Sequence, residues 1–216
     1  MSFHKPTDAA GKVKEGLVYG PPGRNAAHLC IDMQRLFDKG SDWAVEWLRR
    51  VLPQVCQVVE LYPAQTIFTR FIPPETLEDA PGSWRRYYEK WPQMLRRNLD
   101  PDFLRLLPEL ELHLETARLF DKPVYSPWMD GRLHRMLQES GVDTLVVTGG
   151  ETDVCLLATV MGAVDLGYRT IIVSDAVCSS TDETHDATMQ VYANRFGQQI
   201  EMIETDRLLQ AVVQGA

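Results

Sequence analysis

Three side chains that could act together in nucleophilic catalysis each stand where a predicted strand ends. Asp32 closes an apolar strand, Lys122 follows a second strand, and Cys155 lies at the start of a predicted helix after a third. Each has an ordinary alternative: a capping carboxylate, a surface lysine and a buried apolar thiol. Together an acid, a cation and a thiol form a base–cation–nucleophile set.

The start of the helix that carries Cys155 favours a reactive thiol. Thr152 is a plausible N-cap for this helix, which places Cys155 in its first turn. Free backbone N–H groups and the helix dipole favour an anion at such a position, so we expect a lowered pKa for the thiol. The same N–H groups could stabilise an oxyanion.

The elements that must position these residues alternate along the chain. Strands are predicted at 26–32, 65–70, 115–120, 143–150, 170–177 and 199–204. Helices are predicted over 42–62 (in two pieces, with Pro53 near the start of the second), 132–140, 152–167, 182–196 and 205–214. This alternation predicts an α/β fold with a parallel sheet covered on both faces. Ligands bind such sheets at the carboxyl ends of the strands, where the three candidate residues stand.

Composition limits the classes of partner. The chain has 216 residues and a formal net charge of −8, which argues against nucleic acid or an anionic membrane as a partner. No apolar run approaches the roughly 18 residues that span a bilayer, and no secretory signal is visible. The four cysteines stand alone, without a C-x-x-C pair, as in a reduced, cytoplasmic protein.

Two segments stand apart from the regular pattern. Residues 1–24 are polar and rich in Gly and Pro, and we interpret them as an arm that wraps its own domain or a neighbouring subunit. Residues 25–216 form one domain, with an insertion at about 72–100 that has no regular period and is dense in Trp, Tyr and Arg. Long irregular insertions of this kind tend to be lids or binding loops.

Aromatic and cationic residues near the strand ends are candidate contacts for a flat or carboxylated small molecule. The candidates are Phe37, Arg70, Trp84, Tyr88, Tyr125, Trp128 and Glu151, with Trp43, Arg85, Arg86, Tyr87 and Trp91 nearby. Each aromatic could instead pack the insertion onto the domain or another subunit. Arg70, the favoured contact, could form a structural salt bridge, and Glu151 could point to solvent.

Five segments resemble the isochorismatase-like cysteine hydrolases, which include nicotinamidases, N-carbamoylsarcosine amidase, and biuret and ureidoacrylate hydrolases. The segments are IDMQRLF (31–37), IFTRF (67–71), DKPVYSPW (121–128), VVTGGETDVCLLATVMGAVDLGY (146–168) and VSDAVCSSTDETHDATM (173–189). The resemblance implies a three-layer αβα, Rossmann-like fold whose six-stranded parallel sheet has the order 3-2-1-4-5-6. It also implies a homo-oligomer, a dimer or a tetramer.

The resemblance assigns roles to the candidate residues. It implies that Asp32, Lys122 and Cys155 are a catalytic triad. It implies a cis peptide bond between Gly150 and Glu151, with the backbone N–H groups of Glu151 and Cys155 forming an oxyanion hole. The expected reaction is hydrolysis of an amide, ureido or carbamoyl C–N bond through a thioester, with release of ammonia or an amine.

The chain departs from the metal-binding members of this family. Nicotinamidases carry metal-binding histidines after the second strand, whereas residues 69–84 contain no histidine and the five histidines of the chain show no ligand spacing. We therefore expect no catalytic metal and no cofactor. Three alternatives stay open: a metal-assisted, nicotinamidase-like deamidase; an isochorismatase-type ether hydrolase, although that enzyme lacks the cysteine; and a binding protein that retained the fold.

Overall fold

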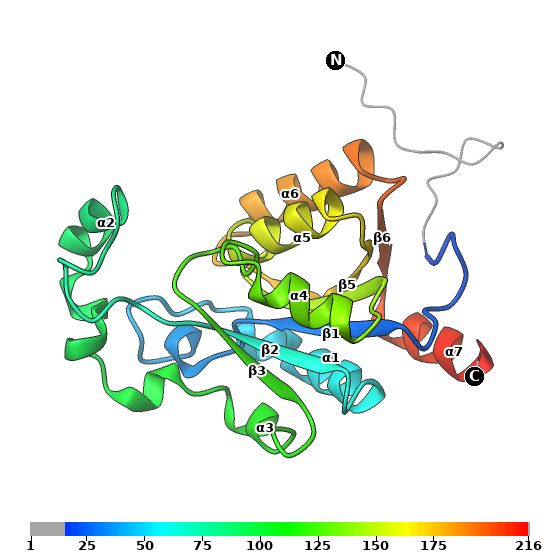
Figure 1. Cartoon of the computed structure of the whole chain (residues 1–216), viewed down its shortest axis with the longest axis horizontal. Coiled ribbons are helices and arrows are strands. Elements are labelled where there is room, and N and C mark those ends of the chain that lie inside the picture. Colours follow the sequence, from blue (N-terminus) through cyan, green and yellow to red (C-terminus); the bar gives the residue numbers. More distant parts are fainter. Residues whose placement is uncertain (1–15, 216) are drawn as a thin grey trace.

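A single parallel sheet organises the computed structural model, which describes residues 16–215. Its six strands lie in the order β3-β2-β1-β4-β5-β6, as expected (Figure 1). The strands are β1 (Ala26–Ile31), β2 (Thr66–Phe71), β3 (Arg118–Lys122), β4 (Thr144–Gly150), β5 (Arg169–Cys178) and β6 (Ile200–Ile203). Every neighbouring pair is parallel, so all carboxyl ends meet at one edge of the sheet.

Helices cover both faces of the sheet, which confirms the three-layer αβα prediction. On one face lie α1 (Leu48–Leu61), α3 (Pro108–Glu111) and α7 (Thr205–Gly215), whose apolar side chains pack on alternate residues of the strands. On the other lie α4 (Arg132–Glu139), α5 (Cys155–Asp165) and α6 (Asp182–Arg195). Since both faces are covered, every residue of β1 and β4 is buried.

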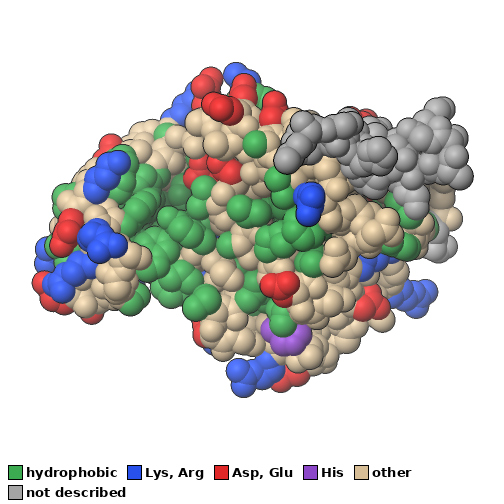
Figure 2. Space-filling model, turned by 90° about the horizontal axis from the view of Figure 1, so that it is seen from above, with side chains coloured by type: hydrophobic (Ala, Val, Ile, Leu, Met, Phe, Trp, Pro, Cys, Tyr) green, Lys and Arg blue, Asp and Glu red, His purple; other side chains and the backbone are tan. Residues whose placement is uncertain are grey.

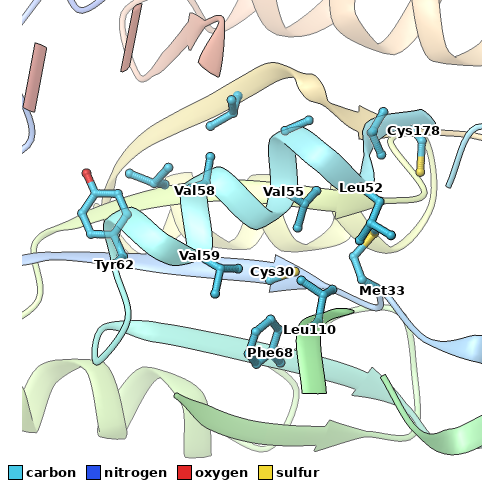
Figure 3. Close-up of a cluster of buried hydrophobic side chains, with 14 of the residues drawn as sticks. Cys30, Met33, Leu52, Val55, Val58, Val59, Tyr62, Phe68, Leu110 and Cys178 are labelled. Carbon is cyan, nitrogen blue, oxygen red and sulfur yellow. The ribbon is translucent and has the colours of Figure 1, made fainter. Parts of the chain in front are cut away.

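Helix α1 shows how one layer is held. Its residues Val55, Val58 and Val59 point toward the sheet, where Cys30 of β1 and Phe68 of β2 meet them (Figure 3). The helix is continuous through Pro53, its sixth residue, so the prediction of two helical pieces was wrong. A proline there removes one backbone hydrogen bond and strains the preceding turn. Burial of one full face of the helix offsets that loss.

The insertion is more ordered than its sequence suggested. It contains α2 (Trp84–Lys90) and three short 3-10 helices, η2 (Pro92–Met94), η3 (Arg96–Asn98) and η4 (Pro101–Leu104), while a further one, η1 (Arg35–Phe37), follows β1. The apolar side chains of the insertion form a cluster of their own with residues of β2 and of the loop after β1. Figure 1 shows α2 projecting from the body of the protein. The insertion therefore adds a lobe beside the carboxyl ends of the strands.

The described part of the N-terminal arm lies along the sheet edge that β6 forms. The backbone N–H of Gly16 donates to the carbonyl of Met202 (3.1 Å), and that of Tyr19 donates to the carboxylate of Glu201 (3.1 Å). Arg169 donates to the carbonyl of Gly20 (2.6 Å). Residues 1–15 of the predicted arm fall outside the described residues. Within residues 16–215, no helix has the length and apolarity needed to cross a membrane.

Candidate active site

A buried ion pair joins the ends of β1 and β3. The Nζ of Lys122 donates to Oδ2 of Asp32 at 2.6 Å, and the two side chains are only 2% and 1% exposed. The hydroxyl of Thr69, on β2 between them, donates to the other carboxylate oxygen at 2.6 Å. Lys122 is the last residue of β3 rather than a residue beyond it, because the strand ends two residues later than predicted. The sheet thus fixes the carboxylate from two sides.

The ammonium group of Lys122 stays charged although it is buried. Burial disfavours the charge, but the carboxylate of Asp32 and the sulfur of Cys155 outweigh that effect and raise the pKa of Lys122. The carbonyl of Val124 accepts a further hydrogen bond from Nζ at 3.3 Å. A buried pair of this kind needs both partners, since either charge alone would be desolvated without compensation.

Cys155 is the first residue of α5 and is 5% exposed, and the charges of Lys122 and Asp32 both act on its thiol. Burial raises the pKa of its thiol well above the usual range, Lys122 opposes that rise, and Asp32 adds to it. The expectation of a lowered pKa from the helix start is therefore wrong. Desolvation of the buried thiol favours its neutral form.

The turn before Cys155 is fixed by groups from β5 and α6. Thr152 does not cap the helix, which begins three residues after it. Its hydroxyl instead donates to the carbonyl of Cys178 (3.0 Å) and contacts Nδ1 of His185 (2.9 Å). The Gly150–Glu151 peptide bond is cis. Within residues 16–215, neither the N–H of Glu151 nor that of Cys155 donates a hydrogen bond to another protein group.

Gly149 lets the two central strands approach closely at the site. It has a φ of +101°, and a Cβ there would overlap the backbone of Ile31. Ile31 immediately precedes Asp32, which itself has an unusual positive φ of 50°. The close approach brings the carboxylate of Asp32 to the turn that carries Cys155. Sequence reasoning assigned no role to Gly149, although a Gly-Gly pair at the end of a buried strand signals such an approach.

A cavity of about 280 Å³ opens onto Cys155. Its walls come from the loop after β1, the end of β2, the insertion, the loop after β3, and the turns around α5 and β5. The lining residues are Phe37, Asp42, Trp43, Ala44, Phe71, Tyr87, Trp91, Tyr125, Glu151, Val154, Cys155 and Ser180. Figure 2 shows a hollow between the projecting lobe and the body of the protein, and many hydrophobic side chains lie around it.

The cavity contains some of the candidate contacts and leaves out others. Phe37, Tyr125 and Glu151 line it. Arg70 does not, because its guanidinium group forms two hydrogen bonds with Asp121 (2.7 and 2.8 Å). The salt-bridge alternative for Arg70 therefore describes the structure.

Three aromatic candidates pack elsewhere. Trp84 and Tyr88 belong to the apolar cluster that holds the insertion, and Tyr88 is buried. Trp128 lies over α5, where its Nε1 donates to the carbonyl of Thr159 (2.9 Å) and its ring occupies the space that a side chain at Gly162 would fill. These three residues support the walls of the site rather than line the cavity.

Several lining residues were not among the favoured contacts. Trp43, Tyr87 and Trp91, which the sequence offers as further aromatic candidates, line the cavity, and so does Phe71, which the sequence analysis does not name as a contact. The period of a strand could have found Phe71, because it lies two residues beyond Thr69, which contacts Asp32, and so shares its face of the sheet. Arg70, between them, points to the opposite face.

Metal-binding residues do not gather in the described part of the chain. Among residues 16–215, no three His, Cys, Asp or Glu side chains lie together in an arrangement that could hold a metal ion. His28, the histidine most deeply placed in the sheet, bridges the hydroxyls of Thr66 (3.0 Å) and Thr148 (2.8 Å). Burial lowers its pKa to about 3, so it is a neutral structural group.

The open parallel sheet, with an acid, a cation and a thiol at its carboxyl edge, defines an α/β protein of the hydrolase type. The isochorismatase domain model matches residues 26–204, and the chain belongs to the isochorismatase family of hydrolases. This finding confirms the resemblance seen in the sequence.

One relative agrees with this membership, and two solved structures share the fold. A probable inactive nicotinamidase of Arabidopsis thaliana is 31% identical over 175 residues, which are 77% of this chain and 87% of that protein. A cysteine hydrolase from Pseudomonas syringae pv. phaseolicola superposes with a TM-score of 0.81 at 21% identity, covering 94% of this chain and all of that one. N-carbamoylsarcosine amidase from Thermoplasma acidophilum gives a TM-score of 0.68 at 20% identity, with coverages of 84% and 96%.

Proposed function

We propose that the protein is a cysteine-dependent amidohydrolase that cleaves a C–N bond of a small amide, ureido or carbamoyl compound. The observation that carries the proposal is that Cys155 lines a cavity and lies within electrostatic reach of the buried Asp32–Lys122 pair. A neutral thiol beside a carboxylate can lose its proton as it attacks, which is general-base activation of a nucleophile.

The first half of the reaction forms a thioester. Asp32 takes the thiol proton while Sγ of Cys155 bonds to the substrate carbonyl carbon, and the carbonyl oxygen becomes an oxyanion. The N–H groups of Glu151 and Cys155 donate to that oxygen in this proposal, which is supported by their having no partner within residues 16–215. Asp32 then gives its proton to the leaving nitrogen, the C–N bond breaks, and ammonia or an amine departs.

The second half returns the enzyme to its starting state. A water molecule loses a proton to Asp32 as its oxygen attacks the thioester carbon. Collapse of the second oxyanion breaks the C–S bond, and the thiolate regains the proton from Asp32. The charge of Lys122 does not change; it holds the carboxylate in place and stabilises the thiolate whenever it forms.

An ammonia-release screen over small amides, ureas and carbamoyl compounds tests this proposal. We expect turnover that is retained after treatment with a metal chelator and lost in Cys155→Ala. Chelator-sensitive turnover with a stoichiometric metal would favour a metal-assisted deamidase instead. Full activity of Cys155→Ala would refute the cysteine mechanism.

A further inference from the structure

Aromatic rings surround the space above Cys155 on several sides. The indole of Trp43 is central to this wall, with ring centroids 5.8 Å from Tyr87, 6.0 Å from Phe71, 6.4 Å from Phe37 and 6.5 Å from Trp91. The faces of aromatic rings carry partial negative charge and attract cations, most strongly where water is excluded.

The charged side chains that line the cavity are both acids. Asp42 and Glu151 line it, and none of its described lining residues is a lysine or arginine. One carboxylate oxygen of Glu151 accepts a hydrogen bond from the N–H of Ser180 (3.1 Å), and within residues 16–215 the group forms no ion pair. Burial raises the pKa of Glu151, and a cation bound beside it would favour its charged form. Burial raises the pKa of Tyr87 and Tyr125, and the charge of Glu151 adds to that rise. Both hydroxyls therefore lie within the electrostatic reach of this carboxylate.

Two cations lie near the cavity lining and face other groups. Lys122 is paired with Asp32 beneath the floor, and Lys90 lies over the ring of Trp91, 5.6 Å from its centroid. Figure 2 shows acidic side chains close to the hollow, whereas basic side chains of the lobe lie on its outer surface. A substrate carboxylate would face Glu151 without a compensating cation. A neutral substrate would leave that carboxylate desolvated, with Ser180 as its hydrogen-bonding partner and no opposite charge.

We propose that the cavity selects a substrate that carries a positive charge, a quaternary ammonium or protonated amine, which lies against Trp43, Tyr87 and Tyr125 beside Glu151. This inference rests on the proposed amide hydrolysis at Cys155 and names the class of amide. It replaces the carboxylated ligand that the sequence suggested, because Arg70, the cation expected to bind it, is paired outside the cavity.

Two amides of the same shape test the inference. Betaine amide carries a trimethylammonium group where 3,3-dimethylbutanamide carries a tert-butyl group, so the pair differs in charge at one atom. We expect kcat/KM for ammonia release to favour betaine amide by at least about tenfold. The ammonium group also makes the carbonyl more electrophilic, which could raise the rate without any effect on binding. Calorimetry therefore measures the binding of both compounds to the inactive Cys155→Ala variant, where we expect betaine amide to bind more tightly.

Substitution of the acid locates the effect. In Glu151→Gln, the ratio of kcat/KM for betaine amide to kcat/KM for its neutral analogue should fall toward the value that the difference in carbonyl reactivity alone would give. Because the ratio compares two substrates of one variant, a general loss of activity does not change it. Glu183→Gln is the matched control, because it removes the same charge from an exposed position on α6 outside the cavity lining. That variant should keep the preference of the original protein.

The outcomes separate the two proposals. Preferential binding of betaine amide by Cys155→Ala, without ammonia release from any amide by the original protein, would support the cation site and refute the reaction. Ammonia release with no binding preference for the cation would support the reaction and refute the cation site. Failure of Cys155→Ala to bind betaine amide, or a preference that survives Glu151→Gln unchanged, would also overturn the cation site.

Discussion

Replacement of Lys122 by methionine tests the buried ion pair most sharply. The substitution keeps the length and apolar stem of the side chain and removes the charge that Asp32 faces at 2.6 Å. A buried charge that loses its partner destabilises a fold by about 3–5 kcal/mol. Since domains are stable by about 5–15 kcal/mol, this variant should lose a large share of its stability.

A surface pair on the neighbouring strand provides the control. Arg70 and Asp121 lie 2.7 Å apart, but their side chains are 23% and 47% exposed, so solvent screens the pair. Arg70→Met should therefore cost about 0–1 kcal/mol. The two variants remove the same charge from adjacent strands and differ chiefly in burial.

Equilibrium urea denaturation measures the difference. With a slope of about 2–3 kcal/mol per molar urea, Lys122→Met should lower the midpoint by about 1–2 M, and Arg70→Met by less than about 0.5 M. The double variant Asp32→Asn, Lys122→Met should recover most of the loss, because neither charge is then left unpaired. Equal midpoints for the two single variants, or strictly additive effects in the double variant, would refute the reasoning.

Three further predictions concern the residues around this pair. Because burial raises the pKa of Cys155, we expect iodoacetamide to alkylate it slowly at neutral pH and faster as the pH rises above 9, as measured by peptide mass spectrometry; rapid alkylation at pH 6 would contradict the raised pKa. Gly149→Ala should destabilise the fold by several times the roughly 1 kcal/mol expected for Gly131→Ala, because Gly131 also has a positive φ but has open space around it. Similar losses of stability for the two variants in thermal denaturation would be inconsistent with the close approach of the strands. Thr69→Val removes the hydroxyl that donates to Asp32, so kcat/KM for the substrate found in the screen should fall about tenfold; an unchanged kcat/KM would reduce Thr69 to a packing role.

The sequence predicted the sheet well, and the structure brings the three candidate residues to one edge of it. Long apolar strands that alternate with helices leave few topologies, and the matching segments around Asp32, Lys122 and Cys155 gave the strand order. The three side chains come together because the carboxyl ends of parallel strands share one edge. Strand limits were less certain, as β3 shows, since its edge position leaves it without a continuous apolar run.

The lining of the cavity depended on facts that no local pattern holds. Arg70 looked like a contact from its place at a strand end, yet alternation along β2 sends Phe71 into the cavity and Arg70 to Asp121. The pKa of Cys155 followed from burial by distant segments, not from its place at the start of a helix. Tertiary packing sets where a side chain points and how far it is shielded from water. The helices of the insertion are likewise held by the apolar cluster that they form with Leu36 and Phe71.

Intact-mass spectrometry of the acid-quenched enzyme tests the central claim most directly. During turnover of the amide found in the ammonia-release screen, the original protein should carry an adduct equal to the acyl group on Cys155. Hydroxylamine should release this adduct, as it does a thioester. Asp32→Asn should carry less of the adduct, because deprotonation of the thiol slows, and Cys155→Ser should carry no thioester. Ammonia release at full rate with an unmodified Cys155, or from Cys155→Ala, would contradict the account.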